Sequence, residues 1–74
     1  MSRIMPYLAL IETAADASFS AYVPDLPGCV SCGDTIDEAR QLIDEAVQLH
    51  IESLRRHGEP VPSPSVVMHT VNAA

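Results

Sequence analysis

The stretch from Val23 to Ala39 constrains the fold most, because it holds two turn signals of different chemistry. Pro24 has no backbone donor and is expected to end an extended run. Asp25–Gly28 reads Asp-Leu-Pro-Gly, and predicts a turn because proline fixes φ while glycine permits a positive φ. Thr35 and, three residues later, Glu38 form the capping-box pattern that opens a helix. The stretch therefore predicts strand, turn, short strand and helix in that order.

Helical spacing of apolar residues after the cap predicts one long helix from Ile36 to about His57. Gly58 is a natural residue to follow its C-terminus. About 22 helical residues extend roughly 33 Å, so the end of the helix is expected to project towards a second subunit. The expected buried face holds Ile36, Ala39, Ile43, Ala46, Val47, His50 and Leu54.

Three extended runs precede this helix. Ile4–Glu12 is nearly continuous apolar sequence and predicts a strand covered on at least one face. Ser18–Val23 alternates, with Phe19, Ala21 and Val23 on one face, and predicts a half-buried antiparallel strand. Cys29–Cys32 is expected to be a short third strand.

A fourth strand is expected after the helix. Pro60–Pro64 cannot be helical, and Ser65–Val71 is rich in β-branched residues. The predicted fold is α+β with the order β-β-β-α-β. Three antiparallel strands carry the helix on one face, and the fourth strand lies beside the first and parallel to it, through a right-handed crossover.

Length and charge bound the function. The chain has 74 residues, a single domain, and its net charge is −6 with no lysine. A chain this short buries only about 60% of its unfolded surface, so self-association into a dimer or tetramer is expected. An acidic chain without a basic stripe is not expected to bind nucleic acid directly, and suits a basic protein partner. The alternative is that the charge only maintains solubility.

The cellular compartment is inferred from targeting signals that are not recognised in the sequence. No signal peptide is recognised, and no run reaches the roughly 20 apolar residues that span a bilayer. The protein is therefore expected to be cytoplasmic, without a membrane partner, and its two cysteines to be reduced.

Motifs for catalysis are weak. Cys29-x-x-Cys32 precedes the helix, and residues three apart in a strand point to opposite faces, so free thiols are expected rather than a redox or zinc site. Asp25, Asp34 and Glu38 could be imagined in a metal cluster with Asp37, but turn and capping chemistry accounts for all four. Neither a catalytic residue, a metal site nor a cofactor is predicted.

The motifs Val23–Cys29 and Gly33–Ala39, with the later Gly58-x-Pro60-x-Pro-x-Pro run, resemble the HicB family, the antitoxins of HicAB toxin–antitoxin pairs. The resemblance implies a partial RNase H-like fold and binding of a small basic HicA toxin, an RNase that cleaves mRNA. Many family members continue into a C-terminal DNA-binding domain. This sequence stops at Ala74, so one HicB-like domain over residues 1–74, without the DNA-binding part, is expected.

The expected contact surface combines the turn, the acidic start of the helix and one aromatic anchor. An exposed Leu26 would indicate docking, whereas a buried Leu26 would be a plug for the core. Two other functions stay open, a small metal-dependent nuclease on an RNase H-like scaffold and a structural oligomerisation module. The predicted partner-binding residues are Tyr22, Asp25, Leu26, Asp34, Asp37 and Glu38.

Overall fold

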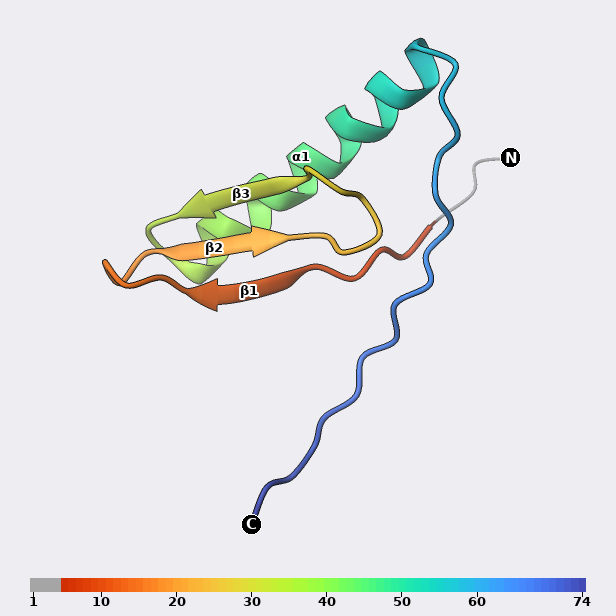
Figure 1. Ribbon diagram of the computed structural model, residues 1–74. Coiled ribbons are helices and arrows are strands. Elements are labelled where there is room, and N and C mark those ends of the chain that lie inside the picture. Colours follow the sequence, from red (N-terminus) through yellow and green to blue (C-terminus); the bar gives the residue numbers. More distant parts are fainter. Residues whose placement is uncertain (1–4) are drawn as a thin grey trace.

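The computed structural model describes residues 5–74 and places one long helix across a small sheet (Figure 1). The sheet has the order β1-β2-β3, and both neighbouring pairs are antiparallel. The predicted α+β arrangement of three antiparallel strands and one long helix is confirmed. The elements are β1 (Leu10–Thr13), β2 (Phe19–Tyr22), β3 (Val30–Gly33) and α1 (Ile36–Arg56).

The register of the sheet defines two ends. Thr13 and Gly33 both pair with Phe19, at the end where the β1–β2 loop lies and where β3 leads into α1. Leu10 and Val30 both pair with Tyr22, at the end where the chain turns from β2 to β3. We call these the hairpin end and the turn end.

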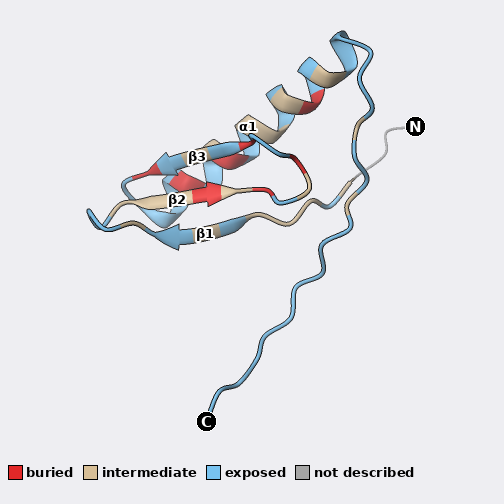
Figure 2. Ribbon diagram, in the orientation of Figure 1, coloured by how far each residue is buried: buried red, intermediate tan, exposed pale blue. Residues whose placement is uncertain are grey.

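The core lies between α1 and one face of the sheet, as the red segments of Figure 2 show. Ala21 is buried and Tyr22 is half-buried, which confirms the predicted alternation of β2. Within residues 5–74 no helix or strand covers the opposite face of the sheet. The buried hydrophobic side chains are Ala21, Val23, Leu26, Cys29, Ala39, Ile43 and Ile51.

The predicted cap opens α1, with one difference in detail. The Glu38 amide donates to Thr35 Oγ1 at 3.1 Å, and the Asp34 amide, rather than that of Thr35, donates to Glu38 Oε1 at 3.1 Å. His57 is the C-cap and Gly58 follows with φ +68°, so the predicted end of the helix is confirmed. No helix among the described residues is long and apolar enough to cross a bilayer.

The first strand is shorter than predicted. Its ladder begins at Leu10 because the partner strand ends at Tyr22 and the chain then turns. Met5–Ala9 precedes β1 and extends it past the end of β2. Met5, Tyr7 and Ala9 in this extension pack against the core. Ile4, the predicted first residue, lies outside the described residues.

The predicted fourth strand is not confirmed, because the sheet within residues 5–74 consists of β1, β2 and β3 alone. Ser65–Val71 joins no ladder in residues 5–74, although it runs extended away from the sheet (Figure 1). The Asp25 carboxylate accepts hydrogen bonds from the backbone amides of Ser65 and Val66 at the start of this segment. From there the chain diverges from β1. The observed order is β-β-β-α, and the partial RNase H-like fold stays a prediction.

Candidate protein-binding surface

The six predicted contact residues do not form one surface. Asp34, Asp37 and Glu38 lie at the hairpin end, where β3 leads into α1. Asp25 and Leu26 lie in the β2–β3 connection at the turn end. The length of β3 therefore separates the turn from the acidic start of the helix.

Leu26 is a plug for the core. Its side chain is 0% exposed, the largest fully buried side chain among the described residues. The turn is fixed around it, because the Leu26 amide donates to the Val23 carbonyl and the Cys29 amide donates to the Leu26 carbonyl, both at 3.0 Å. A residue so enclosed cannot touch a partner, so we leave it out of the candidate surface.

Asp25 is engaged within the chain. Its carboxylate accepts hydrogen bonds from the Ser65 hydroxyl at 2.6 Å, the Ser65 amide at 2.9 Å and the Val66 amide at 3.2 Å. These bonds, above all that of the Ser65 hydroxyl, hold the pKa of Asp25 below its usual value. Asp25 therefore ties the C-terminal segment to the β2–β3 turn.

The acidic start of α1 is exposed. Asp37 makes only a 3.4 Å ion pair with Arg40, and both side chains are largely in water. Such pairs contribute little to stability, so the charge of Asp37 is available to a partner. Glu38 is partly engaged, because it caps the helix through the Asp34 amide. Asp34 is exposed beside it.

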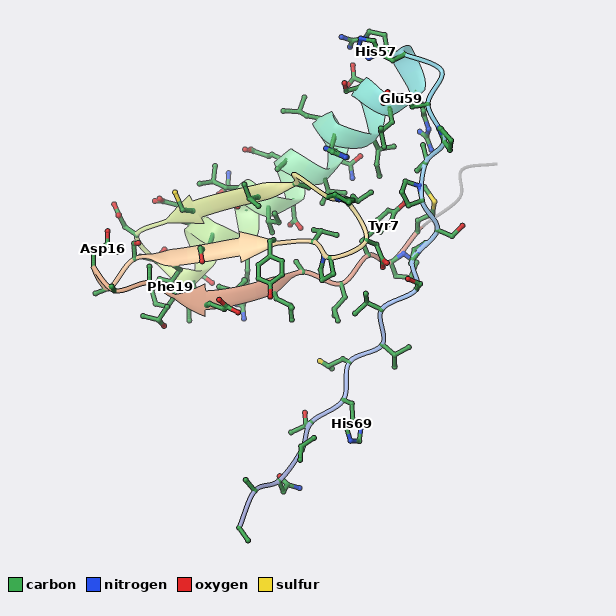
Figure 3. All side chains as sticks on the ribbon, viewed as in Figure 1. Tyr7, Asp16, Phe19, His57, Glu59 and His69 are labelled. Carbon is green, nitrogen blue, oxygen red and sulfur yellow. The ribbon has the colours of Figure 1, made fainter. Side chains whose placement is uncertain are left out.

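Asp16 adds a fourth carboxylate at this end, which sequence reasoning missed. It lies in the β1–β2 loop, beyond Phe19, at the hairpin end (Figure 3). Hydrogen bonds from the Ser18 hydroxyl at 2.5 Å and the Ser18 amide at 3.1 Å lower the pKa of Asp16. Only the strand register, which brings this loop to the start of α1, could have revealed it. We call Asp16, Asp34, Asp37 and Glu38 the acidic end.

The sheet face opposite α1 carries the aromatic residue predicted as an anchor. Tyr22 lies between Leu10 and Val30 in one cross-strand row, and Val30 is 65% exposed. The Tyr22 hydroxyl lies 3.5 Å from Glu12 Oε1, one step towards the acidic end. Leu10 and Val30, which flank Tyr22, could be found from the alternation of side chains along β1 and β3 once the strand register was known. We call this the open face: Leu10, Glu12, Ser20, Tyr22, Val30 and Cys32.

The cysteines show no arrangement for joint chemistry. Cys29 is buried in the core, and Cys32 is exposed on the open face, as residues three apart in an extended run require. Burial raises the pKa of the Cys29 thiol. Among the residues that the structure describes, no three His, Cys, Asp or Glu side chains are grouped to hold a metal ion.

Comparison with known proteins gives sequence relatives over nearly the whole chain. Residues 7–74 match the family model described as HicB_like antitoxin of bacterial toxin–antitoxin system. A UPF0150 protein of Synechocystis sp. is 42% identical over 66 residues, which are 89% of this chain and 84% of the relative. A UPF0150 protein of Thermoplasma acidophilum is 39% identical over 69 residues, which are 93% of this chain and 100% of the relative.

A solved structure agrees with these relatives. The N-terminal domain of the Burkholderia pseudomallei antitoxin HicB superposes with a TM-score of 0.70 at 34% sequence identity. The match covers 78% of this chain and 69% of that chain. The similarity therefore extends from the sequence to the arrangement of the sheet and the helix.

Proposed function

Since the chain belongs to the HicB-like antitoxin family, we propose that it binds a small basic HicA-type toxin, an mRNA-cleaving RNase, and covers the toxin's active site. Binding alone is the activity, with no reaction of its own. The protein would act in the cytoplasm, where it meets this toxin, and would bind no nucleic acid itself. A net charge of −6 without any lysine supports that division of roles.

One observation carries the choice of surface. The half-buried Tyr22 lies between the exposed Leu10 and Val30 on the open face, and Glu12 lies one step from this row towards the acidic end. An aromatic side chain between aliphatic neighbours is the kind of anchor that dominates binding energy at protein interfaces. The acidic end beside it supplies charge of the sign that a basic partner prefers. We propose that the toxin contacts both the open face and the acidic end.

The mechanism is steric and electrostatic. A protein that cleaves RNA holds phosphates with basic side chains, and most of its affinity for RNA comes from that contact. Carboxylates of the acidic end would occupy those basic side chains, while the open face covers the neighbouring surface. RNA and antitoxin would then compete for one site. We further propose that the antitoxin is a homo-oligomer, a dimer or tetramer, as expected for so short a chain.

The test uses the full chain and a HicA-type toxin encoded beside its gene. We expect the wild-type chain to bind this toxin in calorimetry and to inhibit its cleavage of RNA. Tyr22→Ala should weaken binding at least tenfold, since truncation of a central aromatic anchor costs about 2 kcal/mol or more. The matched control is Leu49→Ala, at a residue of α1 that is 66% exposed and lies away from the open face.

Two results would count against these proposals separately. Absence of both binding and inhibition by the wild-type chain would overturn the antitoxin function. Equal binding by the Tyr22→Ala and Leu49→Ala chains, with the wild type active, would overturn only the choice of surface.

A further inference from the structure

The segment Ser65–Val71, which we call the tail, exposes apolar side chains to water. Val67 is 85% exposed and Val71 75% exposed, and Met68 lies open between them. Figure 3 shows the tail, with His69 labelled, extending from the body of the molecule. Apolar side chains arranged along an extended, β-branched segment are unfavourable in water and favour a strand in contact with another surface.

The backbone of the tail also lacks a ladder. The amides of Ser65 and Val66 donate to Asp25, and from Val67 onwards no backbone hydrogen bond is formed within residues 5–74. A strand is stable when its backbone groups pair with a neighbouring strand. The tail therefore has the composition of a strand and needs an edge to pair with.

The outer edge of β1 is open for such pairing, whereas in its extension Met5–Ala9 the Tyr7 amide already donates to the Met5 carbonyl. β1 is an edge strand of the sheet, and unpaired edges are templates for a further strand. A cavity of about 490 Å³ lies between this extension and α1, with Tyr7, Ala9, Ile43 and Val47 in its lining. A strand added to this edge would place alternate side chains over that cavity, which α1 lines with Asp44, Glu45 and Gln48 beside its apolar residues.

The tail does not reach this edge within its own chain. The Tyr7 hydroxyl donates to the Pro62 carbonyl, and Asp25 binds Ser65 and Val66, so the chain crosses the turn end of the sheet at these points. Figure 1 shows it diverging from β1 thereafter. Within residues 5–74 no strand therefore pairs with the outer edge of β1.

Charge favours a second copy as the partner. Two chains with a net charge of −6 repel each other, so contact between copies is least costly where charge is absent. Residues 60–74 contain no Asp, Glu, Lys or Arg, and neither does Met5–Ile11. A basic toxin, by contrast, would be drawn to the acidic end. The two uncharged segments are thus complementary in apolar character, and both the outer edge of β1 and the tail from Val67 onwards have unpaired backbone groups within residues 5–74.

We propose that two copies exchange tails, so that the tail of each adds a strand to the β1 edge of the other and covers the cavity beside α1. The inference rests on the self-association included in the proposed function, and it is independent of toxin binding. It assigns the fourth strand expected from the sequence to the partner copy. Self-association then completes a sheet that is incomplete in the single chain.

Cross-linking between two differently tagged full chains tests the exchange. Both carry Cys32→Ser, which removes the exposed thiol and keeps the buried Cys29. One chain adds Leu10→Cys in β1, and the other adds either Val67→Cys or Met68→Cys in the tail. We expect a disulfide between the two chains for one tail position much more than for the other, since consecutive strand residues point to opposite faces. Ala74→Cys, beyond the tail, is the control and should not cross-link.

Light scattering supplies the second measurement. The wild-type chain should have the mass of a dimer or larger even-numbered assembly, and Val67→Asp with Val71→Asp should halve it, because carboxylates would enter the apolar contact. Ala73→Asp with Ala74→Asp adds the same charge beyond the tail and should leave the mass unchanged. The aspartates lie on exposed residues, so the fold of each chain should persist.

The outcomes separate this inference from the proposed function. A monomeric wild-type chain overturns both the exchange and the self-association. A dimer that cross-links only tail to tail, cross-links equally from both tail positions, or survives the Val67→Asp and Val71→Asp changes overturns the exchange while self-association stands. Toxin binding is read separately, with the Tyr22→Ala chain.

Discussion

Gly33 sits where β3 approaches the start of α1 most closely. A Cβ atom at this position would lie 2.9 Å from the Ala39 amide nitrogen and 3.0 Å from Glu38 Cγ, closer than atoms pack. We expect Gly33→Ala to lower the free energy of unfolding by about 1–3 kcal/mol, the usual cost of overpacking. Urea denaturation followed by circular dichroism measures it. The control is Cys32→Ala at the exposed neighbour, and equal stability of the two variants would contradict the close approach.

Asp25 makes the stability of the tail's attachment depend on pH. Its pKa is lowered in the folded chain from 3.8, so the folded state prefers the ionised carboxylate. The resulting stability is present above pH 3.8 and is lost as the pH falls through the lower folded value. We expect the Ser65 and Val66 amide resonances to shift in that acid range in NMR titrations of the wild type. In the Asp25→Asn chain this titration should be missing.

The comparison with Asp25→Asn is needed because Asp16 also titrates with a lowered pKa. Its hydrogen bonds with Ser18 lie at the hairpin end and should be unaffected by the substitution. Identical acid titration of the Ser65 amide in both chains would refute the Asp25 attachment.

At the scale of elements, α1 depends on its cap. The Thr35 hydroxyl accepts the Glu38 amide, one of the helix donors that has no partner within the helix. Thr35→Ala should lower the free energy of unfolding by about 1 kcal/mol, whereas Thr35→Ser keeps the hydroxyl and should stay near the wild type. Thermal or urea unfolding of the three chains decides it. A serine chain as unstable as the alanine chain would show that the hydroxyl has no capping role.

The elements differ in how far the sequence predicts them, for physical reasons. The bounds of α1 follow from signals next to them in the chain, Thr35 at its start and Gly58 after its end, and both are confirmed. β1 and the tail differ from the prediction because a strand forms only where a partner strand is available to pair with it. The ladder of β1 begins at Leu10 because its partner β2 ends at Tyr22. The tail has the composition of a strand but does not reach an edge of the sheet within residues 5–74.

The candidate surface shows the same limit. The charge of Asp34 and Asp37 was readable from the sequence, as was the face on which Tyr22 lies. Their neighbours were not, since Asp16 reaches the acidic end and Val30 reaches Tyr22 only through the strand register. Leu26 stands in a turn, where local reasoning allows both an exposed and a buried side chain. Burial against α1 is a property of the assembled fold.

For the whole molecule, the distribution of negative charge should control how fast the toxin is bound. The chain Asp34→Lys with Asp37→Lys raises the net charge by four, from −6 to −2, and so does the chain Glu52→Lys with Glu59→Lys at the other end of α1. If the acidic end faces the basic toxin, the first pair should slow association about tenfold at low salt and the second much less, because steering depends on charge near the contact. In stopped-flow experiments this difference in association rate should shrink as the salt concentration rises. The reason is that the Debye length is only about 10 Å at 0.1 M, and exposed charges farther apart are largely screened. Equal slowing by the two pairs would mean that only net charge matters, and the acidic end would then no longer be the contact.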